Sequence, residues 1–289
     1  MLEGVFREVA ADRHVALRQA ALRRQEWYPA PPGVAVVDAS AADLVAAFGQ
    51  LKADLDGHGV ALARVDRLLT NDELILLASL FGLPQLQLDA RHAPYVEDDV
   101  ILNLRADHPE TDDLEWKLLF AENYVMMHSE LAGRLVAEQV RYLLFQCVVA
   151  PRRDHGGQTL LRPMQRVYES LTATQVAILS ATRHAAFRDP PPLLSTWDGR
   201  VVLAVKDAEG EDLPWRFTGD EGGVVEDDVN DAIRALLAAM YTEEIWGLPW
   251  EPCLLGVFDN RRYLHGRTFA QRPSDGPARH LREIRVFTA

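Results

Sequence analysis

Cysteine is nearly absent from this chain. Cys147 and Cys253 are the two cysteines in 289 residues, and each lies in an apolar, strand-like stretch. Free Cys is among the most buried residue types, and disulfides are rare in reducing compartments. We therefore expect two buried free thiols in a cytoplasmic protein rather than a disulfide.

Long apolar segments and positive charge are also scarce. No stretch reaches about 18 uninterrupted apolar residues, the length of a membrane-spanning helix. The N-terminus carries Arg7, Asp12, Arg13 and Arg18 among its apolar residues, which is unlike a secretory signal. The formal net charge of −13 disfavours nucleic acid and anionic membranes as partners. We expect a small-molecule substrate, no nucleic acid and no membrane, and a homo-oligomer stays open.

The composition suits one large core. A chain of 289 residues with 48% hydrophobic content fits a single domain, with residues 1–32 as an N-terminal helical extension and 33–289 as the core with helical insertions. Helices are expected at 1–27, 41–55, 71–81 (capped by Asn71), 164–171, 173–180 and 227–241. Strands are expected at 60–65, 100–104, 142–149, 158–161, 201–205, 254–258 and 281–286.

These elements predict the fold class. The chain should be mainly β with flanking helices (α+β), built on a double-stranded β-helix, that is, a cupin-like jelly roll. A parallel α/β sheet would need regular strand–helix alternation through the middle of the chain, and that alternation is missing.

Two His-x-Glu sequences occur, and context separates them. At this composition roughly one His-x-acid pair is expected by chance. His108-Pro109-Glu110 stands in a polar run with a proline and is interpreted as a solvated loop. His128-Ser129-Glu130 follows the apolar residues 124–127. A short strand there would project His128 and Glu130 to the same side, although a strand-edge histidine with a solvated glutamate is the alternative.

A second half of the pattern follows far downstream. Residues 253–258 form a buried-strand pattern, 259–262 a polar turn, and His265-Gly266 comes next. After a turn at 273–277, the last strand would carry Arg279 at its mouth, beside the same cavity as His265. Two imidazoles and one carboxylate can occupy one face of an octahedral ion, the facial triad of non-haem Fe(II) oxygenases.

These motifs resemble a known family. In order along the chain they are Asn123-Tyr124 with His128-Ser129-Glu130, Gly156–Thr159, Asp259–Arg267 and Arg279–Arg282. Over roughly residues 33–289 the chain is similar to the taurine dioxygenase/clavaminate synthase (TauD/TfdA) superfamily of Fe(II)- and 2-oxoglutarate-dependent oxygenases. The finer likeness is to bacterial natural-product members, including asparagine oxygenase-like and isonitrile-pathway enzymes.

The resemblance implies the site residues and the chemistry. It makes His128, Glu130 and His265 the iron ligands. It makes Arg279 the partner of the distal carboxylate of 2-oxoglutarate, with Thr159 hydrogen-bonded to the same carboxylate. Consumption of 2-oxoglutarate and O2 would release succinate and CO2, with hydroxylation as the default outcome. Halogenation is disfavoured, because related halogenases lack the carboxylate and bind halide in its place.

Two positions depart from the family pattern. A second arginine often follows the 2-oxoglutarate arginine by four residues, and here that position is Glu283. Either Arg282 substitutes from the neighbouring position or Glu283 leaves the pocket. The middle ligand is often aspartate, and Glu130 is longer but can still coordinate.

The substrate is the least determined part. The resemblance suggests Asn123 and Met126 beside His128 as substrate contacts, with 189–196 and Trp215-Arg216-Phe217 as lid or wall candidates. Ordinary core packing is an equal alternative for Met126, Trp215 and Phe217. Arg216 could pair with a substrate carboxylate, which favours an amino-acid-like or other small polar natural-product precursor.

Other functions stay open. A jelly-roll metal-binding protein that acts as a non-oxidative ligand binder or a redox-neutral enzyme could carry the same triad, as could a hydrolytic zinc enzyme. Arg279 and Thr159 discriminate, because a 2-oxoglutarate user requires a carboxylate clamp. His14 is expected in solvent, and no Gly-x-Ser-x-Gly elbow supports a serine nucleophile.

Overall fold

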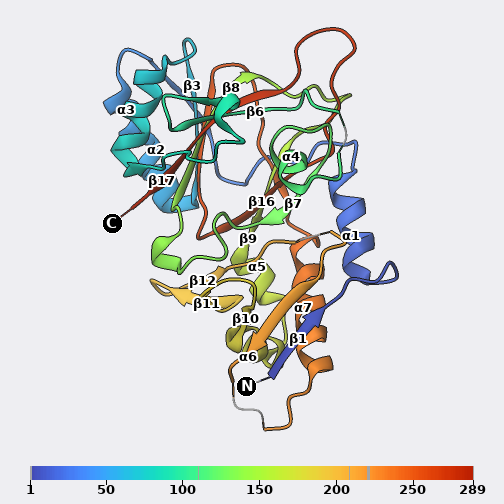
Figure 1. Ribbon diagram of the computed structural model, residues 1–289. Coiled ribbons are helices and arrows are strands. Elements are labelled where there is room, and N and C mark those ends of the chain that lie inside the picture. Colours follow the sequence, from blue (N-terminus) through green and yellow to red (C-terminus); the bar gives the residue numbers. More distant parts are fainter. Residues whose placement is uncertain (1, 110, 208, 220–221, 289) are drawn as a thin grey trace.

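Two β-sheets form the centre of the protein, with helices on their outer sides (Figure 1). The computed structural model describes residues 2–109, 111–207, 209–219 and 222–288. The larger sheet has the order β2-β3-β15-β8-β17-β6-β5, with β4 also pairing with β17. Its strands are β2 (Val36–Ala39), β3 (Val60–Val65), β4 (Leu83–Pro84), β5 (Val96–Glu97), β6 (Ile101–Arg105), β8 (Tyr142–Val149), β15 (Leu254–Asp259) and β17 (His280–Phe287). Its pairings are antiparallel except that β2 runs parallel to β3.

The smaller sheet has the order β14-β9-β16-β7. Its strands are β7 (Val125–His128), β9 (Thr159–Pro163), β14 (Trp246–Gly247) and β16 (Tyr263–Arg267). Two lesser sheets consist of β1 (Leu2–Phe6), β13 (Leu213–Phe217) and β10 (Thr182–His184), and of β11 (Leu194–Trp197) with β12 (Arg200–Leu203).

The helices lie on both outer sides of this pair of sheets. They are α1 (Arg13–Leu22), α2 (Leu44–His58), α3 (Asn71–Phe81), α4 (Leu114–Leu119), α5 (Met164–Glu169), α6 (Ala173–Ala181) and α7 (Glu226–Met240), with short 3-10 turns η1 (Ala93–Tyr95) and η2 (Val136–Glu138). Figure 1 shows α2 and α3 beside the large sheet and α5, α6 and α7 at the opposite end of the molecule.

Three apolar clusters match these layers. One lies between the two sheets, where Phe145 of β8 stacks on Phe258 of β15 in a cluster that also includes Leu161 of β9. A second fills the space under α2 and α3. The third joins Met127 and Leu264 of the small sheet to α1, α6 and α7. Each fully buried large apolar side chain contributes roughly 1.5–3 kcal/mol, so the inter-sheet layer is a stable base for a site.

The mainly β architecture with flanking helices agrees with the sequence prediction, and most predicted elements occur within a few residues of their expected bounds. The N-terminal extension does not. The predicted helix over 1–27 is instead β1 followed by the shorter α1, because Leu2–Phe6 pair with β13. The cap of α3 is also Thr70 and not Asn71, since Thr70 and Glu73 form a reciprocal capping box.

The structure also tests the expectations for the cysteines and for a membrane-spanning helix. Cys147 and Cys253 are both free thiols, the first buried and the second half-buried. Among the described residues, no helix combines the length and the apolar content needed to cross a bilayer.

Candidate metal centre and its cavity

A cavity of about 880 Å³ opens between the two sheets. Its walls include side chains from β7, β9, β16 and β17, together with the loop after β7. This volume falls within the range of small-molecule sites, about 300–1,000 Å³. The motifs from the middle and from the C-terminal part of the chain therefore meet in one cavity.

Three potential metal ligands lie together on this wall. His265 of β16 pairs directly across from His128, the last residue of β7, and Glu130 follows two residues later. The Nε2 atoms of His128 and His265 lie 3.6 and 3.8 Å from Oε2 of Glu130, and the candidate ligand atoms all lie within 4.8 Å of one another. One ion can reach all three, and the donor set of two imidazoles and a carboxylate suits Fe(II).

The imidazoles are oriented for ligation. Nδ1 of His128 lies 2.9 Å from the backbone carbonyl oxygen of Met126, which favours the tautomer that leaves Nε2 free for a metal. Burial, followed by the adjacent His128, lowers the pKa of His265 well below its usual value. A neutral imidazole is the form that binds metal.

The backbone of Glu130 is held by a buried amide. Oδ1 of Asn260 accepts the Glu130 N–H at 2.7 Å, while its Nδ2 donates to the carbonyl oxygens of Glu130 and Val140 at 3.1 and 3.0 Å. Asn260 is fully buried. The asparagine of the Asp259-Asn260 motif thus fixes the turn that carries the carboxylate ligand.

The carboxylate of Glu130 divides its oxygens between two partners. Oε2 faces the histidines, whereas Oε1 lies 3.0 Å from Nη1 of Arg285. The Nε of Arg285 donates to Oε1 of Glu283 at 2.5 Å. Burial raises the pKa of Glu130, but the Arg285 guanidinium and the two histidines together lower it by more, so the pKa lies below its usual value. The guanidinium thus leaves one oxygen of Glu130 facing the histidines.

Sequence reasoning missed Arg285. The signal was alternation along the last strand, because Leu281, Glu283 and Arg285 share one face by the period of two. Leu281 lies in the inter-sheet cluster, and Glu283 and Arg285 line the cavity.

Two buried arginines lie at another wall of the cavity. Nη2 of Arg279 donates to Oγ1 of Thr159 at 3.3 Å, while its Nε and Nη1 are buried with no partner among the described residues. Nη2 of Arg267 donates to the backbone oxygens of Ala121 and Asn123, both at 3.0 Å, and its Nε is likewise without a partner in the described chain.

These arginines fit an anion. Burial lowers the pKa of Arg279 to about 10. Burial and then the neighbouring Arg279 lower that of Arg267 to about 9. Two desolvated cations side by side are costly without a counter-charge, and a guanidinium with unused donors suits a carboxylate. Oγ1 of Thr159 accepts from Trp250 at 2.8 Å as well as from Arg279, which leaves its own hydroxyl hydrogen to donate.

The two neighbours of Arg279 on the last strand face opposite ways. Arg282 points away from the cavity and donates to the Leu69 carbonyl oxygen at 2.8 Å and to Oε1 of Gln146 at 2.9 Å. Glu283 lines the cavity. Arg282 therefore does not substitute at the carboxylate pocket, while Glu283 remains in the wall of the cavity.

The structure does not bring the predicted substrate contacts to the cavity wall. Met126 is buried in the apolar cluster behind β7. The amide of Asn123 donates to the Thr111 carbonyl oxygen at 3.3 Å. Arg216 is half-exposed and pairs with Glu3 of β1 at 2.7 Å. None of the three is among the described residues that line the cavity, so their role as substrate contacts stays a prediction without support from the geometry.

The lid candidates divide between the core and the cavity wall, and two histidines differ from expectation. Trp215 and Phe217 belong to the core, whereas Leu193, from the 189–196 segment, does line the cavity. His14 is buried beside Glu8 at 3.0 Å and is not in solvent. His108 contacts the rings of Tyr95, Trp116 and Phe120, and Glu110 lies outside the described residues.

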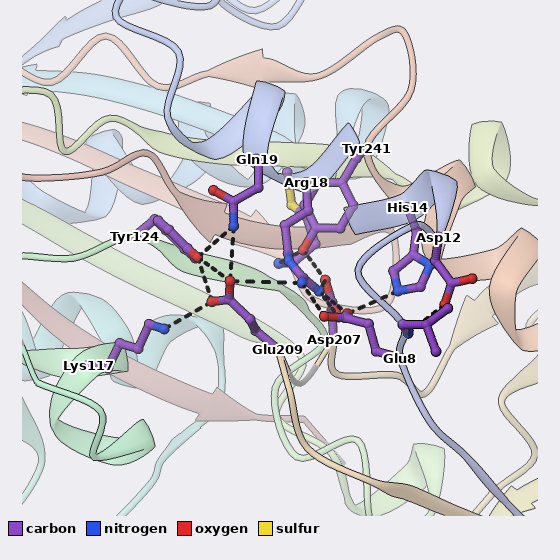
Figure 2. Close-up of polar contacts among 12 residues, drawn as sticks. Glu8, Asp12, His14, Arg18, Gln19, Lys117, Tyr124, Asp207, Glu209 and Tyr241 are labelled. Carbon is purple, nitrogen blue, oxygen red and sulfur yellow. Dashed lines mark hydrogen bonds and ion pairs between the residues drawn. The ribbon is translucent and has the colours of Figure 1, made fainter. Parts of the chain in front are cut away.

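A buried polar network supports β7 from behind (Figure 2). The hydroxyl of Tyr241 accepts the Met127 N–H at 3.0 Å and donates to Oδ2 of Asp207 at 2.6 Å. Asp207 N–H donates to the Met127 carbonyl oxygen at 3.1 Å. Nη1 of Arg18 lies 3.0 Å from Oδ1 of Asp207 and 2.7 Å from Glu8. The N-terminal helix is thereby tied to the residue that precedes His128.

The fold and the donor set define the class of protein. Two packed sheets with a facial two-histidine, one-carboxylate site and a buried arginine clamp are typical of non-haem Fe(II) oxygenases that use a 2-oxo acid. The chain belongs to the taurine catabolism dioxygenase TauD, TfdA family, whose family model matches residues 25–285. The enzyme class predicted from the sequence, an Fe(II)- and 2-oxoglutarate-dependent oxygenase, is thereby confirmed.

Solved structures share the fold. An asparagine oxygenase in complex with Fe(II), 3-hydroxyasparagine and succinate is 20% identical, with a TM-score of 0.61 over 86% of this chain and 80% of that one. PvcB from Pseudomonas aeruginosa is also 20% identical, with a TM-score of 0.60 over 83% of this chain and 79% of that one. A taurine dioxygenase from Burkholderia xenovorans is 18% identical, with a TM-score of 0.58 over 91% of both chains. No curated protein sequence matches the chain.

Proposed function

We propose that this protein is an Fe(II)- and 2-oxoglutarate-dependent dioxygenase that hydroxylates, or otherwise oxidises, a small amino-acid-like or polar natural-product precursor. The observation that carries the proposal is that the His128, Glu130 and His265 ligand atoms share one cavity with the unpartnered guanidinium of Arg279. A guanidinium with unused donors beside the metal ligands is what a 2-oxo acid co-substrate requires for its second carboxylate.

The residues divide the work as follows. His128, Glu130 and His265 would hold the metal, and Arg285 and Asn260 would hold Glu130. Bound Fe(II) with 2-oxoglutarate and O2 supplies the oxidising power and releases succinate and CO2.

The 2-oxo acid is oriented by the arginine wall. The Arg279 guanidinium would form a bidentate pair with the distal carboxylate, and Thr159 would donate its hydroxyl hydrogen to the same group. Arg267 adds a second buried positive charge beside them. Arg279 directly precedes the first residue of β17, so it would fix the orientation of the co-substrate toward the metal site.

The two sheets support a further proposal on the fold. We infer that β7, β9, β14 and β16 oppose the antiparallel part of the large sheet as the two halves of a double-stranded β-helix. The inter-sheet cluster that takes residues from both supports this jelly-roll interpretation. In such a core the inward positions of facing strands line one ligand cavity.

The substrate class is supported by the size and polarity of the cavity. About 880 Å³ accommodates a 2-oxo acid together with a second small metabolite. Charged residues also line the space beyond the metal ligands, among them Glu283 and Arg285. The asparagine oxygenase of similar fold was solved with a hydroxylated amino acid, which agrees with an amino-acid-like substrate.

A succinate-release screen tests this function. Protein loaded anaerobically with Fe(II) and 2-oxoglutarate would be exposed to O2 with amino acids, their conjugates and aminoglycoside-like compounds, and the products analysed by mass spectrometry. The expected result is substrate-triggered succinate with a product that has gained one oxygen atom or lost two hydrogen atoms. Tight substrate binding that never couples to succinate formation would contradict the proposal.

A further inference from the structure

Glu283 brings a second carboxylate into the cavity close to the metal site. It lies on β17, is 4% exposed and lines the cavity. The Arg285 guanidinium connects it to Glu130, at 2.5 Å on one side and 3.0 Å on the other. A buried carboxylate at this depth is costly unless something balances its charge.

The second oxygen of Glu283 is free to bind a ligand. Oε1 accepts from Arg285, whereas Oε2 has no hydrogen-bond partner within the described chain. Oε2 is also not one of the unpartnered atoms that are shielded from solvent, so a ligand in the cavity can reach it. A carboxylate oxygen is an acceptor with no donor of its own, so the ligand must supply an N–H or O–H group.

The local ion pairing of Glu283 favours a cation over a neutral donor. Glu283 shares the Arg285 guanidinium with Glu130, and a metal ion at Glu130 would add its positive charge on the other side of that guanidinium. Among the described residues, Arg285 is the one ion-pair partner of Glu283. A protonated nitrogen would complete its ion pair in a water-poor space, where charge-assisted hydrogen bonds are strong.

The anion pocket lies elsewhere along the same strand. Arg279 and Glu283 are four residues apart, which corresponds to roughly 13 Å between their Cα atoms in an extended strand, although the Glu283 carboxylate still acts on the Arg279 guanidinium. The unpartnered donors of Arg279 serve the carboxylate end of the cavity, and Glu283 serves a different end. The two ends therefore prefer ligands of opposite charge.

The charged residues at the opening of the cavity do not set the charge preference for a ligand near the metal. Glu211 and Asp212 line the cavity, and so do Arg134 and Lys206. These four lie at exposed or half-exposed positions, where water and salt screen their charges. Glu283 is buried more deeply than these four residues, so its negative charge is screened less and has the larger effect on a ligand near the metal.

We propose that Glu283 determines substrate specificity by pairing with a protonated amine or guanidinium of the substrate and by excluding substrates with an anionic group at that position. This inference rests on the proposed function and narrows its substrate class to cationic or zwitterionic compounds.

The test measures ligand charge preference in the wild type and in Glu283→Gln. The probes are lysine, norleucine and 2-aminoadipate, which share a backbone and end in a cation, a methyl group and a carboxylate, together with their Nα-acetyl forms. Binding is followed anaerobically by calorimetry and by perturbation of the visible band of the Fe(II)–2-oxoglutarate complex. Glu138→Gln, at an exposed position outside the cavity, makes the same change of charge as a control.

The expected result is that wild type binds compounds with a free amine and rejects Nα-acetylnorleucine and Nα-acetyl-2-aminoadipate. Glu283→Gln should weaken the binding of the free amines by about 10- to 100-fold and reduce the difference in affinity between the amines and their acetyl forms. Glu283→Asp should keep that difference, and Glu138→Gln should bind every probe as the wild type does. If wild type binds neutral or anionic probes equally well, or Glu283→Gln binds amines unchanged, the inference is overturned and Glu283 is a structural partner of Arg285.

Two further outcomes are separable. If Glu283→Gln fails to fold, as judged by its thermal melt, the wild-type preference and Glu283→Asp decide the question alone. A wild-type protein that forms no Fe(II)–2-oxoglutarate band would overturn the proposed function itself. Succinate formation coupled only to neutral or anionic substrates would overturn the inference and leave that function standing.

Discussion

The side chains of the metal site are positioned by residues that are distant in the sequence. Glu130 presents Oε2 to the two histidines because Oε1 is taken by Arg285 and its backbone is taken by Asn260. A glutamate has one more rotatable bond than an aspartate, so it loses more freedom when it is fixed. These two supports limit the freedom of the longer glutamate ligand.

Loss of either metal-ligating histidine should abolish iron binding. We expect His128→Ala and His265→Ala to remove the visible band that Fe(II) and 2-oxoglutarate form anaerobically, because two remaining donors cannot define the facial site. His280→Ala is the control, since this ring faces Asn103 at 2.7 Å and not the cavity. An unchanged band in both ligand variants would remove the triad assignment.

Arg279 and Arg282 should behave differently although they lie three residues apart. Arg279→Ala should raise the 2-oxoglutarate KM by roughly 30-fold to several-thousand-fold, since losing a partner of a buried ion pair costs about 2–5 kcal/mol. Iron affinity should change little. Arg282→Ala should instead lower the melting temperature, because Arg282 bonds Leu69 and Gln146 on the other face. A large KM effect from Arg282→Ala with none from Arg279→Ala would contradict this assignment.

At the scale of elements, β17 is the strand that organises the cavity. Its inward face presents Leu281, Glu283 and Arg285, while Ile284 and Val286 pack under α2 and α3. The pairing with β8 shifts register between His280 and Leu281, and a bulge of this kind redirects a side chain. Arg279 lies at that end of the strand and still reaches the cavity.

Helix α1 should contribute to the metal site through β7. Arg18→Met would leave Asp207 buried without its guanidinium, at a cost of about 3–5 kcal/mol, so the melting temperature should fall by roughly 5–10 °C. Because Asp207 and Tyr241 hold Met127, next to His128, we also expect weaker Fe(II) binding, measured by calorimetry well below the melt. Arg13→Met, at an exposed position of the same helix, should change neither value. Unaltered iron affinity in a destabilised Arg18→Met protein would limit the network to a structural role.

For the whole molecule, the cavity lies between the two sheets, so its ligands bind the folded state alone. At about 100 times its dissociation constant a ligand stabilises a protein by about 2.7 kcal/mol. Fe(II) with 2-oxoglutarate should therefore raise the melting temperature by roughly 5 °C in anaerobic scanning calorimetry, and a chelator should reverse the gain. In Arg279→Ala the increment from 2-oxoglutarate should vanish while that from Fe(II) remains; an equal increment in both proteins would place the 2-oxo acid elsewhere.

Local patterns in the sequence were enough for much of this protein. Apolar alternation predicts the strands that carry the site, and β3 and β8 have the predicted bounds. The order of the motifs predicts that His128, Glu130, His265 and Arg279 share one space, because each lies in a strand or directly beside one. Such patterns depend on residues that are close together in the sequence, so they can be recognised without the tertiary structure.

Tertiary contacts decided the rest. Arg216 was expected in the pocket, but β1 pairs with β13 and brings Glu3 to it. Met126 was expected beside the metal, yet its side chain lies in the core. The pairing of β7 with β16 is irregular next to this residue, and sequence alternation does not predict such an irregularity. The Arg285 link from Glu130 to Glu283 joins segments far apart in the chain. Period and propensity determine which residues can face a cavity, but the partner that a buried charge finds depends on which distant strand packs against it.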